Sequence, residues 1–240
     1  MDRTIILSVL GAAVLGFLGM LLLMPDSLDD GSVRLPWLIE QDAQGRTGVF
    51  GFRLGQTTLA EVRRVFREAG EINLFHNPGE TQPYGVEAYF EQIHLQRLRA
   101  DFVITLAADQ ETLGGMYDRG LRISQLGSGG KKVKLDPIDV DRLAEQPIRS
   151  IGYLPKARLD EALIEQRFGT PSERLTESAT GIVHWLYPER GLDIGRDPKG
   201  HVIIQYVNPA DMESLLAPLR RLESEAAQAD SEKSTDDARP

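Results

Sequence analysis

Four side chains of this sequence could bind a metal ion or act as a general base near neutral pH: His76, His94, His184 and His201. Metal sites place histidines at short fixed spacings, and no pair among these four follows such a spacing. His184 and His201 fall on neighbouring expected strands, where they could approach each other. Histidines on strand surfaces are far commoner than ligand pairs, so we predict no metal-binding residue.

The glycine-rich run GSGGKK, residues 127–132, invites comparison with a phosphate-binding loop. Such a loop needs a glycine five positions before its Gly-Lys pair. For Gly130 and Lys131 that position holds Gln125. The run also joins two expected strands, whereas a phosphate-binding loop joins a strand to a helix. We interpret it as a hairpin turn.

Asp136, Asp139 and Asp141 form a cluster of carboxylates that resembles a cation site. A calcium loop requires a glycine at its sixth position and a glutamate further on. The sixth position is Asp141 when counted from Asp136, and Ala144 when counted from Asp139. Carboxylates in the first turn of a helix complement its dipole. The cluster therefore predicts a short helix near residues 139–144.

No candidate for covalent catalysis stands out in the sequence. The chain has no cysteine, which excludes thiol chemistry and disulfides, and it lacks a G-x-S-x-G nucleophile motif. A Ser/His/Asp triad is recognised by geometry and not by order, so an enzyme remains the third alternative. We predict no catalytic residue, no cofactor and no enzymatic activity.

The net charge of the protein argues against one class of partner, nucleic acid. The 240 residues carry a formal net charge of −9. An acidic chain of this kind is repelled by nucleic acid, so we predict no nucleic-acid partner.

Residues 4–24 contain no charged side chain. As a helix these 21 residues would be roughly 31 Å long, which matches a bilayer core of about 30 Å. The nearest basic residue before the stretch is Arg3, and the next one after it is Arg34. The positive-inside rule then predicts a single-pass anchor in the inner membrane, with the N-terminus cytoplasmic and the bulk of the chain periplasmic.

A cleaved signal peptide is the alternative to this anchor, although the apolar run is longer than usual for one. Ser8, Ala12 and Gly16 form a stripe of small residues that could pack two anchors together as a homo-oligomer. We predict that residues 25–34 form a short tether. Residues 223–240 have no large apolar side chain and predict a disordered acidic tail.

The body of the chain contains an internal repeat with an offset of 102 residues. Thr58 and Asp160 are good N-caps for helices, and Thr58 with Glu61 forms a capping box. Three apolar pairs share the offset: Ala60 with Ala162, Val62 with Ile164, and Phe66 with Phe168. Arg167 interrupts the apolar face of the second helix. A second match at the same offset places the helix starts Asp109 and Asp211 in register.

Between these anchors both copies read as antiparallel strands. We expect strands at residues 86–95 and 98–106 in the first copy, and at 182–187, 192–195 and 201–207 in the second. A hairpin at 121–126 and 132–135 and a strand at 148–153 precede the second helix. The predicted fold class is α+β, an N-terminal transmembrane helix followed by two helix-plus-antiparallel-meander repeats. The domains are 1–24, 25–34, 35–113, 114–222 and 223–240.

Two short motifs of these copies resemble those of a known family. Residues 54–62, LGQTTLAEV, are similar to the first helix motif of small envelope lipoproteins of the SmpA/OmlA (BamE) type. Residues 168–171, FGTP, with 184–187, HWLY, are similar to their later motif and first strand. The tandem arrangement resembles the β-lactamase inhibitor protein fold, within a membrane-anchored envelope protein of Gram-negative bacteria. The family's lipidated cysteine is absent. The resemblance implies a protein that binds other proteins and catalyses nothing.

Three aromatic residues are the candidates for partner binding. Trp185 and Tyr187 lie two apart on one expected strand and so point to one face, which Tyr206 on a nearby strand could share. An exposed aromatic face would suit a protein partner. If helices cover this face instead, the three residues are core.

These observations lead to a function hypothesis with one main alternative. We expect a membrane-anchored, periplasmic, non-catalytic protein-interaction module of the cell envelope with an envelope protein as its partner. The alternative is a ligand sensor that binds a lipid or a cell-wall fragment between the repeats. That alternative predicts an enclosed apolar pocket at the repeat junction.

Overall fold

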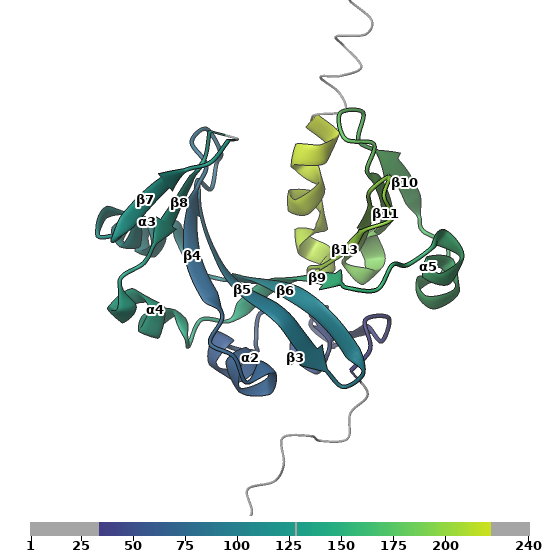
Figure 1. Ribbon diagram of the computed structural model, residues 1–240, viewed down its shortest axis with the longest axis horizontal. Helices are drawn as coiled ribbons and strands as arrows, with labels where there is room; N and C mark the ends of the chain where they lie inside the picture. Colours follow the sequence, from purple (N-terminus) through teal and green to yellow (C-terminus); the bar gives the residue numbers. More distant parts are fainter. Residues whose placement is uncertain (1–33, 128, 222–240) are drawn as a thin grey trace, which may run out of the picture. The chain divides into compact units, whose positions relative to one another are not determined.

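The computed structural model describes residues 34–127 and 129–221. Most of its strands form one antiparallel ten-stranded sheet (Figure 1). The strands in spatial order are β10 (Glu173–Thr176), β11 (Val183–Tyr187), β12 (Leu192–Arg196), β13 (Val202–Tyr206), β9 (Ile148–Pro155), β6 (Leu98–Leu106), β5 (Tyr84–Leu95), β4 (Glu71–His76), β8 (Lys131–Lys134) and β7 (Arg122–Gln125).

A second, small sheet and short helices complete the described part. The small sheet consists of β1 (Glu40–Gln41), β2 (Thr47–Val49) and β3 (Phe52–Arg53). The helices are α2 (Leu59–Phe66), α3 (Gln110–Asp118), α4 (Pro137–Leu143) and α5 (Glu161–Phe168), with 3-10 turns η1 (Pro188–Arg190) and η2 (Pro209–Asp211). A C-terminal helix occupies residues 212–221.

The predicted helix starts at Thr58, Asp109 and Asp160 are confirmed, whereas Asp211 ends the 3-10 turn η2, whose N-cap is Asn208. The Thr58 hydroxyl accepts a hydrogen bond from the Glu61 backbone, and the Glu61 carboxylate accepts one from the Thr58 backbone at 2.8 Å. At the equivalent position before α5, the Asp160 carboxylate accepts a hydrogen bond from the Leu163 backbone at 2.8 Å. Asp109 caps α3 in the same way. Each cap satisfies a backbone donor that the first helical turn leaves unpaired.

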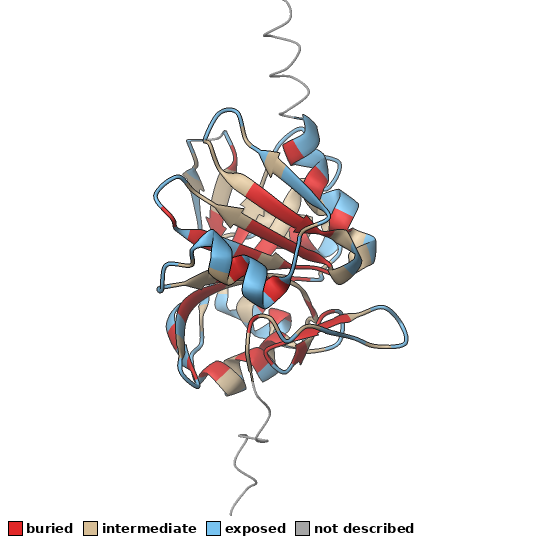
Figure 2. Ribbon diagram, turned by 90° about the vertical axis from the view of Figure 1, so that its right-hand side faces the viewer, coloured by how far each residue is buried: buried red, intermediate tan, exposed pale blue. Residues whose placement is uncertain are grey.

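One face of the large sheet carries the main hydrophobic core. Strand register aligns six buried residues in a single row across six strands: Phe90, Phe102, Tyr153, Ile204, Ile194 and Trp185. Phe66 of α2 packs on this row, with its ring centroid 4.7 Å from that of Phe102. Phe50 contacts the same ring from the turn between β2 and β3. Buried residues therefore alternate along the central strands (Figure 2).

The opposite face of the sheet is covered over only part of its width. The C-terminal helix packs there on β11, where Leu186 joins Met212, Leu216 and Leu219 in a smaller apolar cluster. Figure 1 shows this helix, in yellow, on the other side of the strands from α5. Along β5, β6, β9 and β13 the same face is half exposed, and we call it the open face. Its side chains include Glu87, Tyr89, Val103, Thr105, Ser150 and Gln205.

The predicted fold class is wrong in its first element, the transmembrane helix. Within the described ranges 34–127 and 129–221, no helix is long and apolar enough to cross a membrane. Helices α2 to α5 have seven to nine residues, whereas a span needs about 20. The segment 4–24 itself lies outside the described residues. The predicted single-pass inner-membrane location, with a periplasmic bulk and a signal anchor, rested on that helix and is withdrawn with it.

The fold is instead a sheet-rich α+β structure in which both copies share one sheet. The first copy contributes β4, β5 and β6, and the second contributes β10 to β13. Strand β9 lies between β6 and β13 and joins the two meanders by backbone hydrogen bonds. The sequence pattern indicated strands and turns, but it did not indicate that β9 pairs with both β6 and β13. The predicted tail, and the tether up to residue 33, lie outside the described residues.

Candidate functional site

The structure places the three predicted partner-binding aromatics in the core. Trp185, Tyr187 and Tyr206 are 1%, 4% and 0% exposed. The hydroxyl of Tyr187 donates to the Gly169 carbonyl at 2.8 Å, and that of Tyr206 donates to the Pro36 carbonyl at 2.9 Å. These are the contacts of core residues, so a partner could reach them only after a rearrangement of the fold.

The histidines do not converge. His184 lies between two carboxylates, with Nδ1 3.0 Å from Asp193 and Nε2 3.1 Å from Glu177. His201 instead contacts Asp197 at 2.8 Å. Burial lowers the pKa of the His184 imidazole, but the hydrogen bonds and charges of Asp193 and Glu177 outweigh this effect and raise its pKa above 6.5. Among the described residues, no group of three acids or histidines is arranged to hold a metal ion.

The two other motifs have structural roles. The glycine-rich run turns between β7 and β8, where the Leu126 backbone donates to the Gly130 carbonyl at 2.8 Å. In the acidic cluster, Asp136 caps α4 by accepting a hydrogen bond from the Ile138 backbone at 2.8 Å. Asp139 is 1% exposed and forms an ion pair with Arg119.

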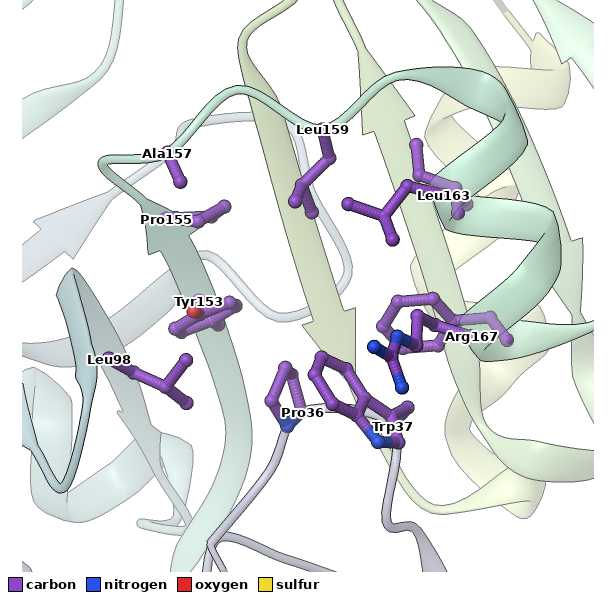
Figure 3. A pocket seen from close by; sticks show the side chains of 11 residues that line it. Pro36, Trp37, Leu98, Tyr153, Pro155, Ala157, Leu159, Leu163 and Arg167 are labelled. Carbon is purple, nitrogen blue, oxygen red and sulfur yellow. The ribbon is translucent and has the colours of Figure 1, made fainter.

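A small apolar pocket lies where the chain passes from the first copy to the second (Figure 3). Its volume is about 210 Å³. One wall comes from Leu98 at the start of β6 and from Tyr153 and Pro155 at the end of β9. The opposite wall comes from Ala157 and Leu159, in the linker before α5, and from α5 itself. Pro36 and Trp37 of the N-terminal segment form a third side.

Long-range contacts hold the N-terminal segment against this pocket. The Tyr206 hydroxyl donates to the Pro36 carbonyl, which fixes the segment beside the core. The next residue, Trp37, stacks with Arg167 of α5, whose guanidinium carbon is 4.6 Å from the indole ring centroid. A stacked pair of this kind is a cation–π contact. It brings an apolar ring and a cation to the same side of the pocket.

Two polar groups interrupt the otherwise apolar lining. Arg167 lines the pocket from the last turn of α5, and within the described ranges no carboxylate lies within ion-pair distance of it. Tyr153 is 3% exposed, and no described residue forms a hydrogen bond with its hydroxyl. Burial raises the pKa of Tyr153 to about 12, so its hydroxyl stays protonated at neutral pH.

Sequence reasoning missed most of this pocket. The one local signal was Arg167, which breaks the apolar face of its helix. Trp37 lies 130 positions away, and its contact with α5 follows no local pattern. The pocket thus depends on packing between segments that are distant in the sequence.

A wider, more polar hollow lies on the other side of the sheet. It has a volume of about 720 Å³ and is lined by the loop 79–82, by Thr105 and Ser150 of the open face, and by the C-terminal helix. Arg149 of β9 crosses it, with donors 3.4 Å from Gln82 and 3.5 Å from Asp211. Both copies therefore contribute to this hollow.

Comparison of the chain with protein-family models, with characterised proteins and with solved structures finds no match. The resemblance to the envelope lipoproteins and to the inhibitor fold therefore stays a prediction. Function has to be argued from the geometry alone.

Proposed function

We propose that this protein is a binding protein that takes up a small apolar group in the pocket between β6, β9 and α5. The observation that carries the proposal is an apolar-lined volume of about 210 Å³ at the junction of the two copies. The ligand-binding alternative predicted an enclosed apolar pocket at this junction, and the pocket found there is apolar but is lined in part by the exposed residues Ala157 and Arg167. The aromatic residues on which the protein-binding alternative first rested are instead buried.

The size of the pocket sets the size of its ligand. An apolar cavity of roughly 150 Å³ is enough to take up benzene. The present pocket therefore suits one ring or a short branched chain. Such a ring buries roughly 150 Å² of apolar surface. At about 25 cal/mol per Å² this contributes at most about 4 kcal/mol, and association costs reduce it, so the dissociation constant should be about 1 mM or weaker.

Two matched variants test this proposal. Ala157 lines the pocket, whereas Ala162 is an exposed residue on α5 that does not. We expect calorimetry or ligand-detected NMR to show benzyl alcohol binding to the unmodified protein and to Ala162→Phe. Ala157→Phe fills the pocket and should abolish binding. Equal binding to all three proteins would place the ligand elsewhere and overturn the proposal.

A second candidate function is the binding of a protein partner on the open face. The favouring observation is Glu87, which lies on this face and receives neither a hydrogen bond nor an ion pair from any described residue. Burial raises the pKa of its carboxyl. A basic side chain of a partner would supply the missing counter-charge. The polar hollow beside Thr105 and Ser150 extends the same face.

Site-specific crosslinking tests this second function. A photo-crosslinker at Thr105 should give a discrete adduct in cells, and one at Arg64, exposed on α2, should not. Glu87→Gln should weaken the Thr105 adduct. Glu91→Gln changes an exposed glutamate on the same strand and should leave the adduct unchanged. Equal adducts at both crosslinker positions would argue against a specific partner on this face.

A further inference from the structure

We infer that the ligand of the apolar pocket is a small monocarboxylate whose apolar part fills the cavity and whose carboxylate pairs with Arg167. This inference rests on the proposed function and adds the chemical class of the ligand. It follows from the two polar groups of the lining, from the contrast with a second stacked arginine, and from the size of the cavity.

The contact of Arg167 with Trp37 leaves the N–H groups of its guanidinium available for a ligand. Its guanidinium stacks on the ring of Trp37 at 4.6 Å. The N–H groups of Arg167 form no hydrogen bond with a described residue. No described carboxylate uses these donors. Arg167 is therefore a positioned cation at an apolar cavity, which suits a bidentate contact with a carboxylate.

A second arginine of the molecule also lies over a tryptophan ring, and its guanidinium is paired with carboxylates. Arg174 stacks on Trp185 with a distance of 4.2 Å to the ring centroid. Its guanidinium forms ion pairs with Glu165 and Glu161 of α5. The described residues thus provide two carboxylates for Arg174 and none for Arg167. A ligand carboxylate would take the place that Glu165 has at Arg174.

The Tyr153 hydroxyl is a second polar group in the lining, and it has no partner among the residues that the structure describes. Other tyrosines with little exposure donate to an acceptor of the chain, as Tyr187 does to Gly169 and Tyr206 to Pro36. Tyr153 is equally buried but has no hydrogen bond with a described residue. Its oxygen is not among the fully buried polar atoms without a partner, so water or a ligand in the pocket can reach it. An oxygen atom of a bound ligand would satisfy it.

The volume of the cavity limits the apolar part of the acid. About 210 Å³ exceeds the roughly 150 Å³ that takes up benzene. An aryl-acetic acid or a short branched acid fits this space. Phenylacetate is therefore a suitable probe. Phenylacetamide has nearly the same shape without the negative charge and is the matched neutral probe.

The experiment compares both probes by calorimetry on the full chain. Arg167 is exposed, and exposed ion pairs are weak, so we expect phenylacetate to bind about threefold more tightly than phenylacetamide. Arg167→Gln should remove this preference and leave the affinity for phenylacetamide unchanged. Arg158→Gln changes an exposed arginine of the adjacent linker that does not line the pocket, and it should keep the preference.

The possible results separate this inference from the proposed function. Equal affinities of the two probes for the unmodified protein, or a preference that survives in Arg167→Gln, would overturn the carboxylate assignment while the pocket stays a binding site. Failure of both probes to bind would overturn both proposals. Circular dichroism of Arg167→Gln checks that the exposed substitution leaves the fold intact.

Discussion

The imidazole of His184 lies 3.0 Å from both carboxylate oxygens of Asp193 in the interior of the protein. The two residues are 9% and 2% exposed. His184 is opposite Gly195 on the neighbouring strand, and the absence of a side chain there leaves room for the ring. On the other side of the ring, Glu177 contacts Nε2. A protonated histidine in this position has two negative partners.

This arrangement predicts a loss of stability at alkaline pH. The pKa of His184 in the folded protein lies above its ordinary value of 6.5. The stabilisation is therefore complete below about pH 6.5 and is lost as the pH rises through the folded-state pKa. His184→Gln should lower the free energy of unfolding by roughly 1 to 3 kcal/mol at pH 6, because it leaves Asp193 without its charged partner. The loss should be smaller at pH 9.

Urea denaturation at both pH values measures this effect. Glu177→Gln removes only the more exposed carboxylate and should reduce the pH dependence without abolishing it. A His184→Gln protein whose stability varies with pH as steeply as that of the unmodified protein would contradict the assignment to His184.

The ion pair between Arg119 and Asp139 predicts a large and asymmetric mutational effect. Both guanidinium contacts are 2.7 Å long, and the carboxylate is 1% exposed. Arg119→Met should destabilise the protein in denaturant unfolding, because it leaves the buried carboxylate of Asp139 with only the longer contact to Arg142. Arg119→Met combined with Asp139→Leu should recover much of that loss.

The exposed pair of Arg220 and Glu213 is the control for this prediction. Its side chains are 44% and 72% exposed, so its disruption by Arg220→Met should cost less than about 1 kcal/mol. Similar losses from the two arginine substitutions would show that burial of Asp139 does not govern the effect.

The two tryptophans should differ sharply in their contribution to stability. Trp185 is 1% exposed in the main core, and Trp185→Ala should cost about 3 to 5 kcal/mol. Trp37 is only half-buried at the pocket, so Trp37→Ala should cost about 1 kcal/mol. Thermal unfolding followed by circular dichroism measures both. A stable Trp185→Ala protein would mean that this residue is not part of the core.

Gly191 should tolerate no side chain. It has a φ of 60°, and a Cβ atom there would lie 2.0 Å from the Val207 carbonyl oxygen. Gly191→Ala should therefore cost more than about 3 kcal/mol. Gly79 also has a positive φ, of 93°, but no atom lies within 4 Å of the position that a Cβ would take there. Gly79→Ala should cost only about 1 kcal/mol, and equal losses in urea unfolding would refute the steric explanation.

Short-range features of the fold could be predicted from the sequence. Thr58, Asp109 and Asp160 start helices because a side-chain oxygen of each accepts a hydrogen bond from the backbone N–H only three residues ahead. The strands β5, β6, β11, β12 and β13 follow from β-rich runs between turns. The interaction that decides each of these features spans a few residues, so the local sequence contains it.

Long-range features were decided only by the tertiary structure. The alternation on β11 placed Trp185 and Tyr187 on one face but could not show that this face joins the core, because its covering elements come from other parts of the chain. The pairing of β9 with β6 on one side and with β13 on the other likewise joins strands that are distant in the sequence. The pocket requires Trp37 to reach Arg167. The sequence by itself thus determined several helices and strands and the helix caps, while packing among distant segments decided which faces are buried and where the apolar pocket lies.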